Sequence, residues 1–236
     1  MDEGPGLGWL WPEVIGSIQS LAPVYDKVNR VISFASDRRL RAEALRDAVG
    51  VDDLVLDAGA GNGVFTQVLL ETQPKVRDVV LLDAIPEMLA KACLNPGIVN
   101  PVVGDFEKTP FRDGVFDSVL MGFSLRDARN MNNALSEVKR VMADGGKLVV
   151  VDLGKPNNPL KKLALAAYWK ALAPLLAFVA VGRVGLRVHA IYKTYRRLPK
   201  NSQLKSMLEK FFTAVEVKEK MLGGALIAFA RLSAGK

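Results

Sequence analysis

A glycine-rich loop is the first part of the chain whose residue types and spacing could serve chemistry. It follows a short apolar stretch, precedes a helical pattern, and consists of Asp57, Ala58, Gly59, Ala60, Gly61, Asn62 and Gly63. Glycines at alternate positions let the backbone turn sharply and leave amide N–H groups free at the start of the following helix. The loop alone is compatible with the ligand sites of several enzyme classes, or with a tight turn that binds nothing.

Two carboxylates follow the loop at similar places in the pattern. Asp83 ends the apolar run 79–82, where a carboxylate can accept hydrogen bonds from both hydroxyl groups of a ribose. Asp105 follows the run 99–103 and could accept from an adenine amino group while Phe106 packs beside the ring. Each acid alone is more often an ordinary strand-end residue, but their order after the loop predicts a nucleoside site. We also include Ala84, Met88, Gly104, Gly122 and Phe123 in this site.

Apolar runs alternate with helical patterns along the chain and define the elements that must position these residues. Such alternation is typical of a parallel sheet that is covered on both faces. We predict strands at 54–56, 79–82, 99–103, 116–121 and 147–152, then a terminal pair at 214–218 and 225–232. We predict helices at 24–34, 37–49, 64–71, 86–92, 131–142 and 204–212, and a turn at 144–146. The fold class is therefore α/β and Rossmann-like, with seven strands of which the last is antiparallel.

The domain organisation follows from the same patterns. We expect an N-terminal helical arm or cap at residues 1–49, of which residues 1–16 form an arm or a loose start, and a main domain at 50–236. An inserted helical lid at 159–198 carries an uncharged stretch, 171–182, with lysines before it and arginines after it. Twelve residues are too few to cross a bilayer as a helix, which needs about 20. We expect this segment to be a buried lid or a surface that meets lipid.

Composition limits the classes of protein that remain. The chain has 236 residues, half of them apolar, and a net charge of +7, which favours anionic partners such as nucleic acid or an anionic membrane. Cys93 and His189 are the only residues of their types, so no internal disulfide and no Cys/His zinc site can form, and we expect no metal. The lone cysteine fits a reducing compartment, and the acidic N-terminus does not resemble a signal peptide. We expect a cytoplasmic protein.

Five segments in order resemble class I S-adenosylmethionine-dependent methyltransferases. They are LDAGAGNG, LLDAIPEML, GDFEKTPF, FDSVLMGFSLRD and LSEVKRVMADGGKLVVVD. Four others, APVYDKVNRVISF at 22–34, GFSLRD at 122–127, VVDLGKPNNPL at 150–160 and the ending MLGGALIAFARL, are similar to the UbiE/COQ5 C-methyltransferases of ubiquinone and menaquinone biosynthesis. The resemblance covers residues 22–232. One departure is DRRLRAE at 37–43, where the family has a tryptophan-containing stretch.

The resemblance implies a reaction and roles for particular residues. S-adenosylmethionine would bind over the glycine loop and methylate a carbon of a polyprenyl quinol or naphthol. Arg126 would stabilise the phenolate or organise a water as base, with Asp127 and Tyr25 as further catalytic candidates. Tyr25 and Asp26 would close over the donor. Alternatively, Arg126 is a structural partner of Asp127 and Tyr25 is part of the core.

Several alternatives stay open at this point. His189 is expected to be packed rather than catalytic. The acceptor could be another lipid or small molecule, or the chain could be a non-catalytic S-adenosylmethionine-binding scaffold. A nucleic-acid methyltransferase is disfavoured, since Gly122-Phe123-Ser124-Leu125 replaces the Asn/Asp-Pro-Pro-Tyr signature. A dehydrogenase is disfavoured because Asp105 and the closing strand pair would have no role in it. Peripheral contact with an anionic membrane and a homodimer are further hypotheses.

Overall fold

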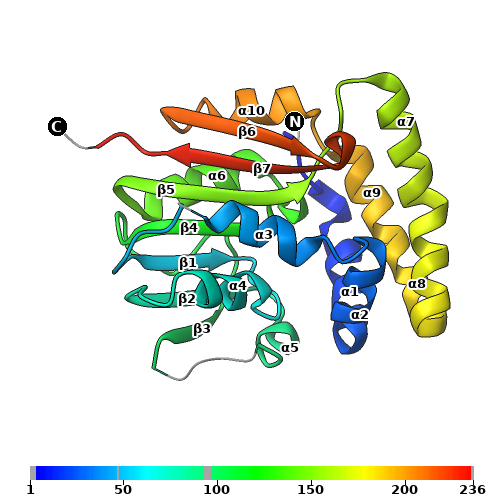
Figure 1. Cartoon of the computed structure of the whole chain (residues 1–236), viewed down its shortest axis with the longest axis horizontal. Coiled ribbons are helices and arrows are strands. Elements are labelled where there is room, and N and C mark those ends of the chain that lie inside the picture. Colours follow the sequence, from blue (N-terminus) through cyan, green and yellow to red (C-terminus); the bar gives the residue numbers. More distant parts are fainter. Residues whose placement is uncertain (1–3, 47, 93–96, 235–236) are drawn as a thin grey trace.

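The computed structural model describes residues 4–46, 48–92 and 97–234, and Cys93 lies outside them. Within these residues, seven strands form one sheet in the order β3-β2-β1-β4-β5-β7-β6 (Figure 1). All neighbouring strands are parallel except that β7 is antiparallel to both β5 and β6, which confirms the predicted fold class. The strands are β1 (Leu54–Ala58), β2 (Asp78–Asp83), β3 (Val99–Val103), β4 (Phe116–Gly122), β5 (Met142–Leu153), β6 (Ala214–Lys220) and β7 (Ala225–Arg231).

Helices cover the sheet on both faces because its central strands are apolar on both sides. Leu148 and Val150 of β5 pack with α6 (Met131–Val141) and α10 (Asn201–Leu208). Val149 and Val151 point to the other face, where they share a core with α3 (Asp37–Leu45) and α4 (Val64–Thr72). The short α5 (Pro86–Leu89) follows β2. The alternation follows from the period of two in a strand.

The described part of the N-terminal segment does not form a loose start. A 3₁₀ turn (Gly8–Leu10) leads into α1 (Trp11–Leu21), and α2 (Tyr25–Ile32) follows a second turn, Ala22–Val24. The backbone amide of Leu7 donates to the carbonyl of Ala128 at 2.8 Å, and the Leu7 side chain is fully buried. Of the two alternatives for residues 1–16, the described part is an ordered arm and not a loose start, because apolar side chains between the glycines and prolines anchor it to the domain.

The insertion is helical, as predicted, and forms a layer of its own on one flank of the molecule (Figure 1). α7 (Pro159–Ala167), a π-helical turn (Tyr168–Leu172) and α8 (Ala173–Val181) form one continuous run. A 3₁₀ segment (Gly182–Val188) then reverses the chain into α9 (His189–Arg197). Trp169, Ala173 and Ala177 face inward and pack with α2. In the described part of the chain, Pro159–Arg197 is the one helical segment that is long and apolar enough to cross a membrane, and it extends well beyond the uncharged stretch 171–182.

Strand and helix ends differ from the predictions in several places: the helix predicted at 204–212 is Asn201–Leu208, and α3 ends at Leu45. Two further differences are larger. β5 begins at Met142, so the predicted turn at 144–146 is part of a strand that bends at Gly145, whose φ is +73°. The helix expected at 86–92 has only the one turn of α5. Neither difference moves the ends of β1, β2 and β4 that carry the predicted site residues.

Candidate active site

The glycine loop adopts the conformation that its residue types predicted. Gly59, Gly61 and Gly63 all have positive φ angles, of +74°, +57° and +77°, which other residues rarely adopt. A Cβ atom on Gly59 would lie 2.4 Å from the Cβ of Ser124, so the loop passes directly over the end of β4. The backbone amide of Gly61 donates to Asp83 Oδ2 at 2.7 Å, which fixes the loop to the end of β2.

A cavity of about 700 Å³, partly open to solvent, lies over this loop; we call it the glycine-loop pocket. Its lining includes these predicted residues: Gly59, Ala60, Gly61, Asn62, Asp83, Ala84, Met88, Asp105, Phe106, Gly122, Phe123, Asp127 and Tyr25. The prediction did not include Trp11, Ile15, Ile18, Arg41, Ile85 and Ser124, which line it too. The first three belong to α1, which covers the pocket.

Four predicted residues do not line the pocket and lie behind it. Asp57 is buried and accepts hydrogen bonds from the backbone amide and hydroxyl of Thr66, at 3.2 and 2.8 Å. Burial raises the pKa of Asp57 to about 6, and its Oδ1 has no hydrogen-bond partner. Ala58 is buried in β1 and accepts from Ser124 through its carbonyl, Gly63 precedes α4, and Gly104 packs on Leu82. These residues shape the loop from below.

The two predicted acids both face the glycine-loop pocket. Asp83 accepts from the amides of Gly61 and Ile85, at 2.7 and 2.8 Å, and each carboxylate oxygen keeps a second lone pair for a ribose hydroxyl. Burial raises the pKa of Asp83. Asp105 forms an ion pair with Arg129, whose guanidinium lies 4.5 Å from the ring centre of Trp11. The arrangement fits a nucleoside whose ribose meets Asp83 and whose base lies near Phe106.

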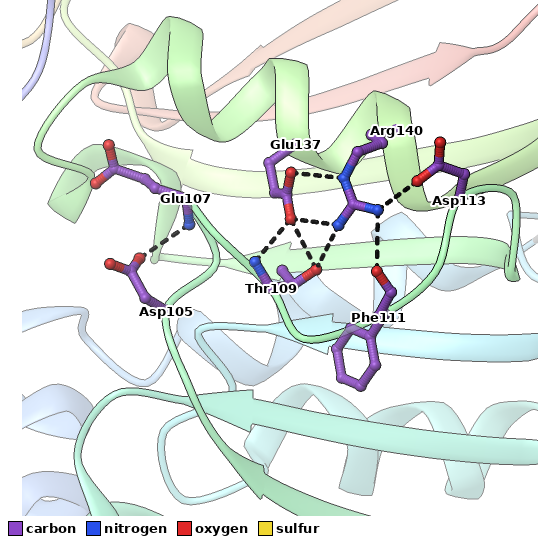
Figure 2. Close-up of polar contacts among 7 residues, drawn as sticks. All are labelled: Asp105, Glu107, Thr109, Phe111, Asp113, Glu137 and Arg140. Atoms are coloured by element: carbon purple, nitrogen blue, oxygen red, sulfur yellow. Dashed lines mark hydrogen bonds and ion pairs between the residues drawn. The ribbon is translucent and has the colours of Figure 1, made fainter.

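Side chains of α6 hold the loop after β3 (Figure 2). Glu137 accepts from the amide and hydroxyl of Thr109, at 2.7 and 2.9 Å. Arg140 bonds the same carboxylate through two nitrogens and donates to the Phe111 carbonyl at 2.9 Å. The bond to Arg140 lowers the pKa of Glu137 to about 2. This network fixes the segment that presents Asp105 to the pocket.

A second cavity, of about 400 Å³, adjoins the first; we call it the arginine pocket. Tyr25, Arg41 and Phe123 line both cavities, so they mark the junction. Phe123 has a positive φ of +60°, a strained conformation of the kind that gathers at functional sites. The rest of the lining comes from Asn29, Ile32, Ser33, Asp37, Arg126, Leu153, Trp169 and Ile191.

Arg126, the predicted catalytic residue, lies in a buried ionic cluster in the wall of the arginine pocket. Asp152 accepts from its Nη1 at 3.1 Å and from its backbone amide at 3.0 Å, and Asp127 Oδ1 lies 3.6 Å from its Nε. Burial alone would lower the pKa of Arg126. The negative charges of Asp127 and Asp152 outweigh this effect, so the pKa of Arg126 is raised. Burial raises the pKa of Asp127 to about 6. Asp152 was missed, although it ends an apolar strand run as Asp57 and Asp83 do.

The remaining predictions have mixed outcomes. Asp26 accepts from the side-chain amide of Asn62 at 2.6 Å, so α2 does close on the glycine loop. His189 is exposed, with its ring 5.8 Å from that of Tyr192, and lines none of the pockets named here, so the expectation that it is packed was wrong. Tyr25 is partly buried, and burial raises its pKa.

The chain resembles known methyltransferases in sequence and in structure. The model of the ubiE/COQ5 methyltransferase family matches residues 12–231. A demethylmenaquinone methyltransferase of Thermus thermophilus is 32% identical over 87% of this chain and 88% of that protein. One from Mycolicibacterium vanbaalenii is 31% identical over 92% of each. In fold, the plantazolicin methyltransferase BpumL, solved with S-adenosylhomocysteine, superposes with a TM-score of 0.63 at 13% identity, over 96% of this chain and all of that one.

These matches and the geometry of the glycine-loop pocket agree. The match extends over nearly the whole described chain, and the relatives are covered almost end to end. The chain is therefore a member of the ubiE/COQ5 methyltransferase family, an S-adenosylmethionine-dependent methyltransferase of quinone biosynthesis.

Proposed function

We propose that the protein methylates a ring carbon of a polyprenyl quinol or naphthol whose ring occupies the arginine pocket. One observation carries this assignment. Three buried N–H groups have no hydrogen-bond partner in the described structure, Arg41 Nε, Arg126 Nε and Trp169 Nε1, and all three residues line this pocket. A buried donor without a partner is costly, so the pocket is suited to a ligand with acceptor oxygens. A quinol ring carries two.

The glycine-loop pocket has the donors and acceptors that the methyl donor requires. S-adenosylmethionine supplies an electrophilic methyl group on a sulfonium. Asp83 and Asp105 both line this pocket, which supports Asp83 as acceptor for the ribose hydroxyls and Asp105 as acceptor for the adenine amino group. Met88 lies beside the loop, where a Cβ on Gly61 would make an ordinary contact of 3.4 Å with its Cε; the positive φ of Gly61 is what favours glycine there. α1 and Asp26 close the pocket from outside.

The polar residues beside the junction of the glycine-loop pocket and the arginine pocket activate the acceptor. Asp127 lines the glycine-loop pocket, and a carboxyl whose pKa is about 6 can take a phenolic proton near neutral pH. Arg126 holds Asp127 in place and is itself oriented by Asp152. In the transfer a ring C–H becomes C–CH₃, the electron pair of the broken S–CH₃ bond stays on sulfur, and one proton leaves to solvent.

An apolar cavity continues from the arginine pocket and is suited to the start of a polyprenyl tail. It lies between α1, α2 and α9 and shares Tyr25, Asn29, Arg126 and Ile191 with the arginine pocket. Val14, Ile18, Leu21, Val28 and Val188 supply much of its remaining wall. A ring in the arginine pocket would therefore have an apolar route for its substituent. The relatives' names, demethylmenaquinone methyltransferase, favour a naphthol ring for this chain.

The outer face of α7 and α8 supports contact with an anionic membrane. Leu160, Leu163, Leu172, Leu175, Phe178 and Val179 are exposed along it, two of them by more than three quarters. The segment between Gly154 and Leu208 contains eleven Lys and Arg and no Asp or Glu. Its positive charge therefore exceeds the net charge of the whole chain, +7. Exposed apolar side chains among basic ones are typical of helices that lie in the plane of an anionic bilayer. A lipid-soluble acceptor would be met there.

The assignment is tested by a panel of acceptors. Purified protein is mixed with S-adenosylmethionine and a demethylnaphthoquinol, a demethylbenzoquinol or phosphatidylethanolamine, and S-adenosylhomocysteine release is measured. We expect release with a quinol only, and none in the Asp83→Ala variant, which loses the ribose contact. Release with the phospholipid alone would assign a different lipid as acceptor. Tight S-adenosylmethionine binding without release on any acceptor would favour a non-catalytic scaffold.

A further inference from the structure

We propose that Arg41 binds the ionised ring oxygen of the acceptor and that this contact lowers the oxygen's pKa for methylation. The assignment rests on the proposed function, since it names a residue that acts on the proposed acceptor. It concerns a side chain from the stretch DRRLRAE, whose charged residues gave no prediction of a site.

The position of Arg41 is the first reason. The methylated carbon must lie where the donor and acceptor cavities meet, and of the described residues only Tyr25, Arg41 and Phe123 line both. Arg41 is the one cation among these three. Its guanidinium carbon is 4.8 Å from the ring centre of Phe123 and 5.8 Å from that of Phe65, which fixes its plane between two aromatic side chains. Arg41 belongs to α3 yet is only 7% exposed.

The charge balance of Arg41 is the second reason. Arg126 is flanked by two carboxylates, Asp127 and Asp152, which offset its charge. Arg41 has a single carboxylate partner, Asp37, at 3.3 Å, and a long contact of 3.5 Å to the Gly122 carbonyl. Its Nε has no partner at all among the described residues. Arg41 therefore keeps more uncompensated positive charge at the junction than Arg126 does.

The backbone beside Arg41 is shaped to admit it. A Cβ atom on Gly122 would lie 3.2 Å from Arg41 Nε and 2.7 Å from Phe65 Cδ1. Glycine at the end of β4 therefore leaves the space that the guanidinium uses. The groups that act electrostatically on Arg41 come from four elements: Asp37 on its own helix, Tyr25 on α2, Asp57 on β1 and Arg126 after β4. Burial is the main cause of the lowered pKa of Arg41.

A fixed cation beside a phenol favours the ionised form of that phenol. Opposite charge within contact distance stabilises the phenolate and makes the ring carbon next to it more nucleophilic. The proton leaves to Asp127, and no oxidant or other reactant is needed. Arg126 then acts as a positioning residue for Asp127, whereas Arg41 touches the substrate.

The test compares Arg41→Gln and Arg41→Lys with Arg38→Gln, a matched control from the same helix whose guanidinium pairs with the exposed Glu71. Three quantities are measured for each protein. They are the affinity for S-adenosylhomocysteine by calorimetry, kcat on the demethylnaphthoquinol, and the pKa of 1-naphthol bound in the presence of S-adenosylhomocysteine. The naphthol titration uses the longer-wavelength absorption of its ionised form and needs no turnover.

We expect Arg41→Gln to bind S-adenosylhomocysteine as the wild type does but to lose about 10²- to 10³-fold in kcat. The pKa of bound 1-naphthol should lie at least about one unit below its free value in the wild type and Arg38→Gln, and return to the free value in Arg41→Gln. Arg41→Lys, which keeps the charge, should recover most of both effects.

Other outcomes overturn the assignment. A kcat of Arg41→Gln within threefold of the wild type, or an unchanged naphthol pKa, would show that Arg41 does not hold the oxygen. Loss of S-adenosylhomocysteine affinity in both variants would make it a support of the donor pocket. If the wild type methylates no quinol, the proposed function fails, and the naphthol titration still decides the role of Arg41.

Discussion

In the proposed assignment, individual side chains divide the site into a part that holds the donor and a part that activates the acceptor. On the donor side, Asp83 accepts hydrogen bonds from the backbone amides of Gly61 and Ile85. Any nucleoside site on this fold can offer such amides. The proposed acceptor side depends on buried charges: Arg41, Arg126, Asp127 and Asp152 are all buried, and Arg126 pairs with both aspartates. Their burial raises the pKa of Asp127 to about 6, which brings a carboxyl into the range of a base at neutral pH.

The proposed role of Asp127 predicts a particular pH profile. A base must be unprotonated to act, so kcat/KM should rise with pH through about 6 and be flat above it. Asp127→Asn should lower kcat/KM by about 10²- to 10⁴-fold and remove this rise. Asp144→Asn, at a position outside the site, should behave as the wild type. A rise near pH 6 that persists in Asp127→Asn would assign the base elsewhere.

Many of the residues that line the glycine-loop pocket could be predicted because they follow the ends of parallel strands, and such ends meet at one edge of the sheet. Arg41 could not, since a basic helical stretch is usually a solvated face, and only the tertiary packing of α3 against Phe65 and Phe123 buries it. Trp11, Ile15 and Ile18 were missed because the sequence around them did not predict a packed helix. The glycines and prolines around them indicated a loose chain, whereas their apolar side chains cover the pocket.

At the scale of helices and strands, side chains of neighbouring elements hold the loops that carry the site residues. The loop after β3 carries Asp105, and its anchor is the Glu137–Arg140 pair of α6 (Figure 2). The element types were predicted well, because continuous apolar runs and helical periods are strong signals. Their ends were predicted less well: β5 begins at Met142 and α5 has only one turn, since hydrogen bonding at the ends depends on neighbours distant in sequence.

The α6 anchor predicts a stability that depends on pH. The pKa of Glu137 is lowered from 4.5 to about 2, so its ionic bond stabilises the fold above pH 4.5 and is lost as the pH falls toward 2. Glu137→Gln should lower the free energy of unfolding by about 1–3 kcal/mol at pH 7, and by less at pH 3.5. Denaturant unfolding at both values measures this. Glu209→Gln, at an exposed pair, is the control, and an equal loss at both values would contradict the prediction.

The surface of the protein is strongly divided in charge and polarity. Figure 1 shows α7, α8 and α9 together on one flank. This part of the chain combines exposed leucines with lysines and arginines. The sequence predicted this segment as a helical insertion, but the continuity of α7 and α8 depends on a π-helical turn that no period indicated. The predicted homodimer stays a prediction.

Membrane contact through this flank predicts a difference between two matched variants. Val179→Glu changes an exposed residue of α8, and Val51→Glu changes an exposed residue before β1. Val179→Glu should weaken co-sedimentation with phosphatidylglycerol vesicles by at least about tenfold, because it removes apolar contact and adds repulsion. Val51→Glu should bind as the wild type, and binding should fall as salt rises. Equal binding by both variants would place the contact elsewhere.

The reaction itself is tested most directly by the position of the transferred methyl group. The protein is incubated with S-adenosylmethionine labelled with ¹³C in the methyl group and with a demethylnaphthoquinol, and the product is examined by NMR. We expect the label as a methyl bonded to a ring carbon, with none formed in Asp83→Ala. A label found on oxygen would contradict C-methylation, and a ring that stays unlabelled while the protein binds S-adenosylmethionine would contradict the proposed acceptor.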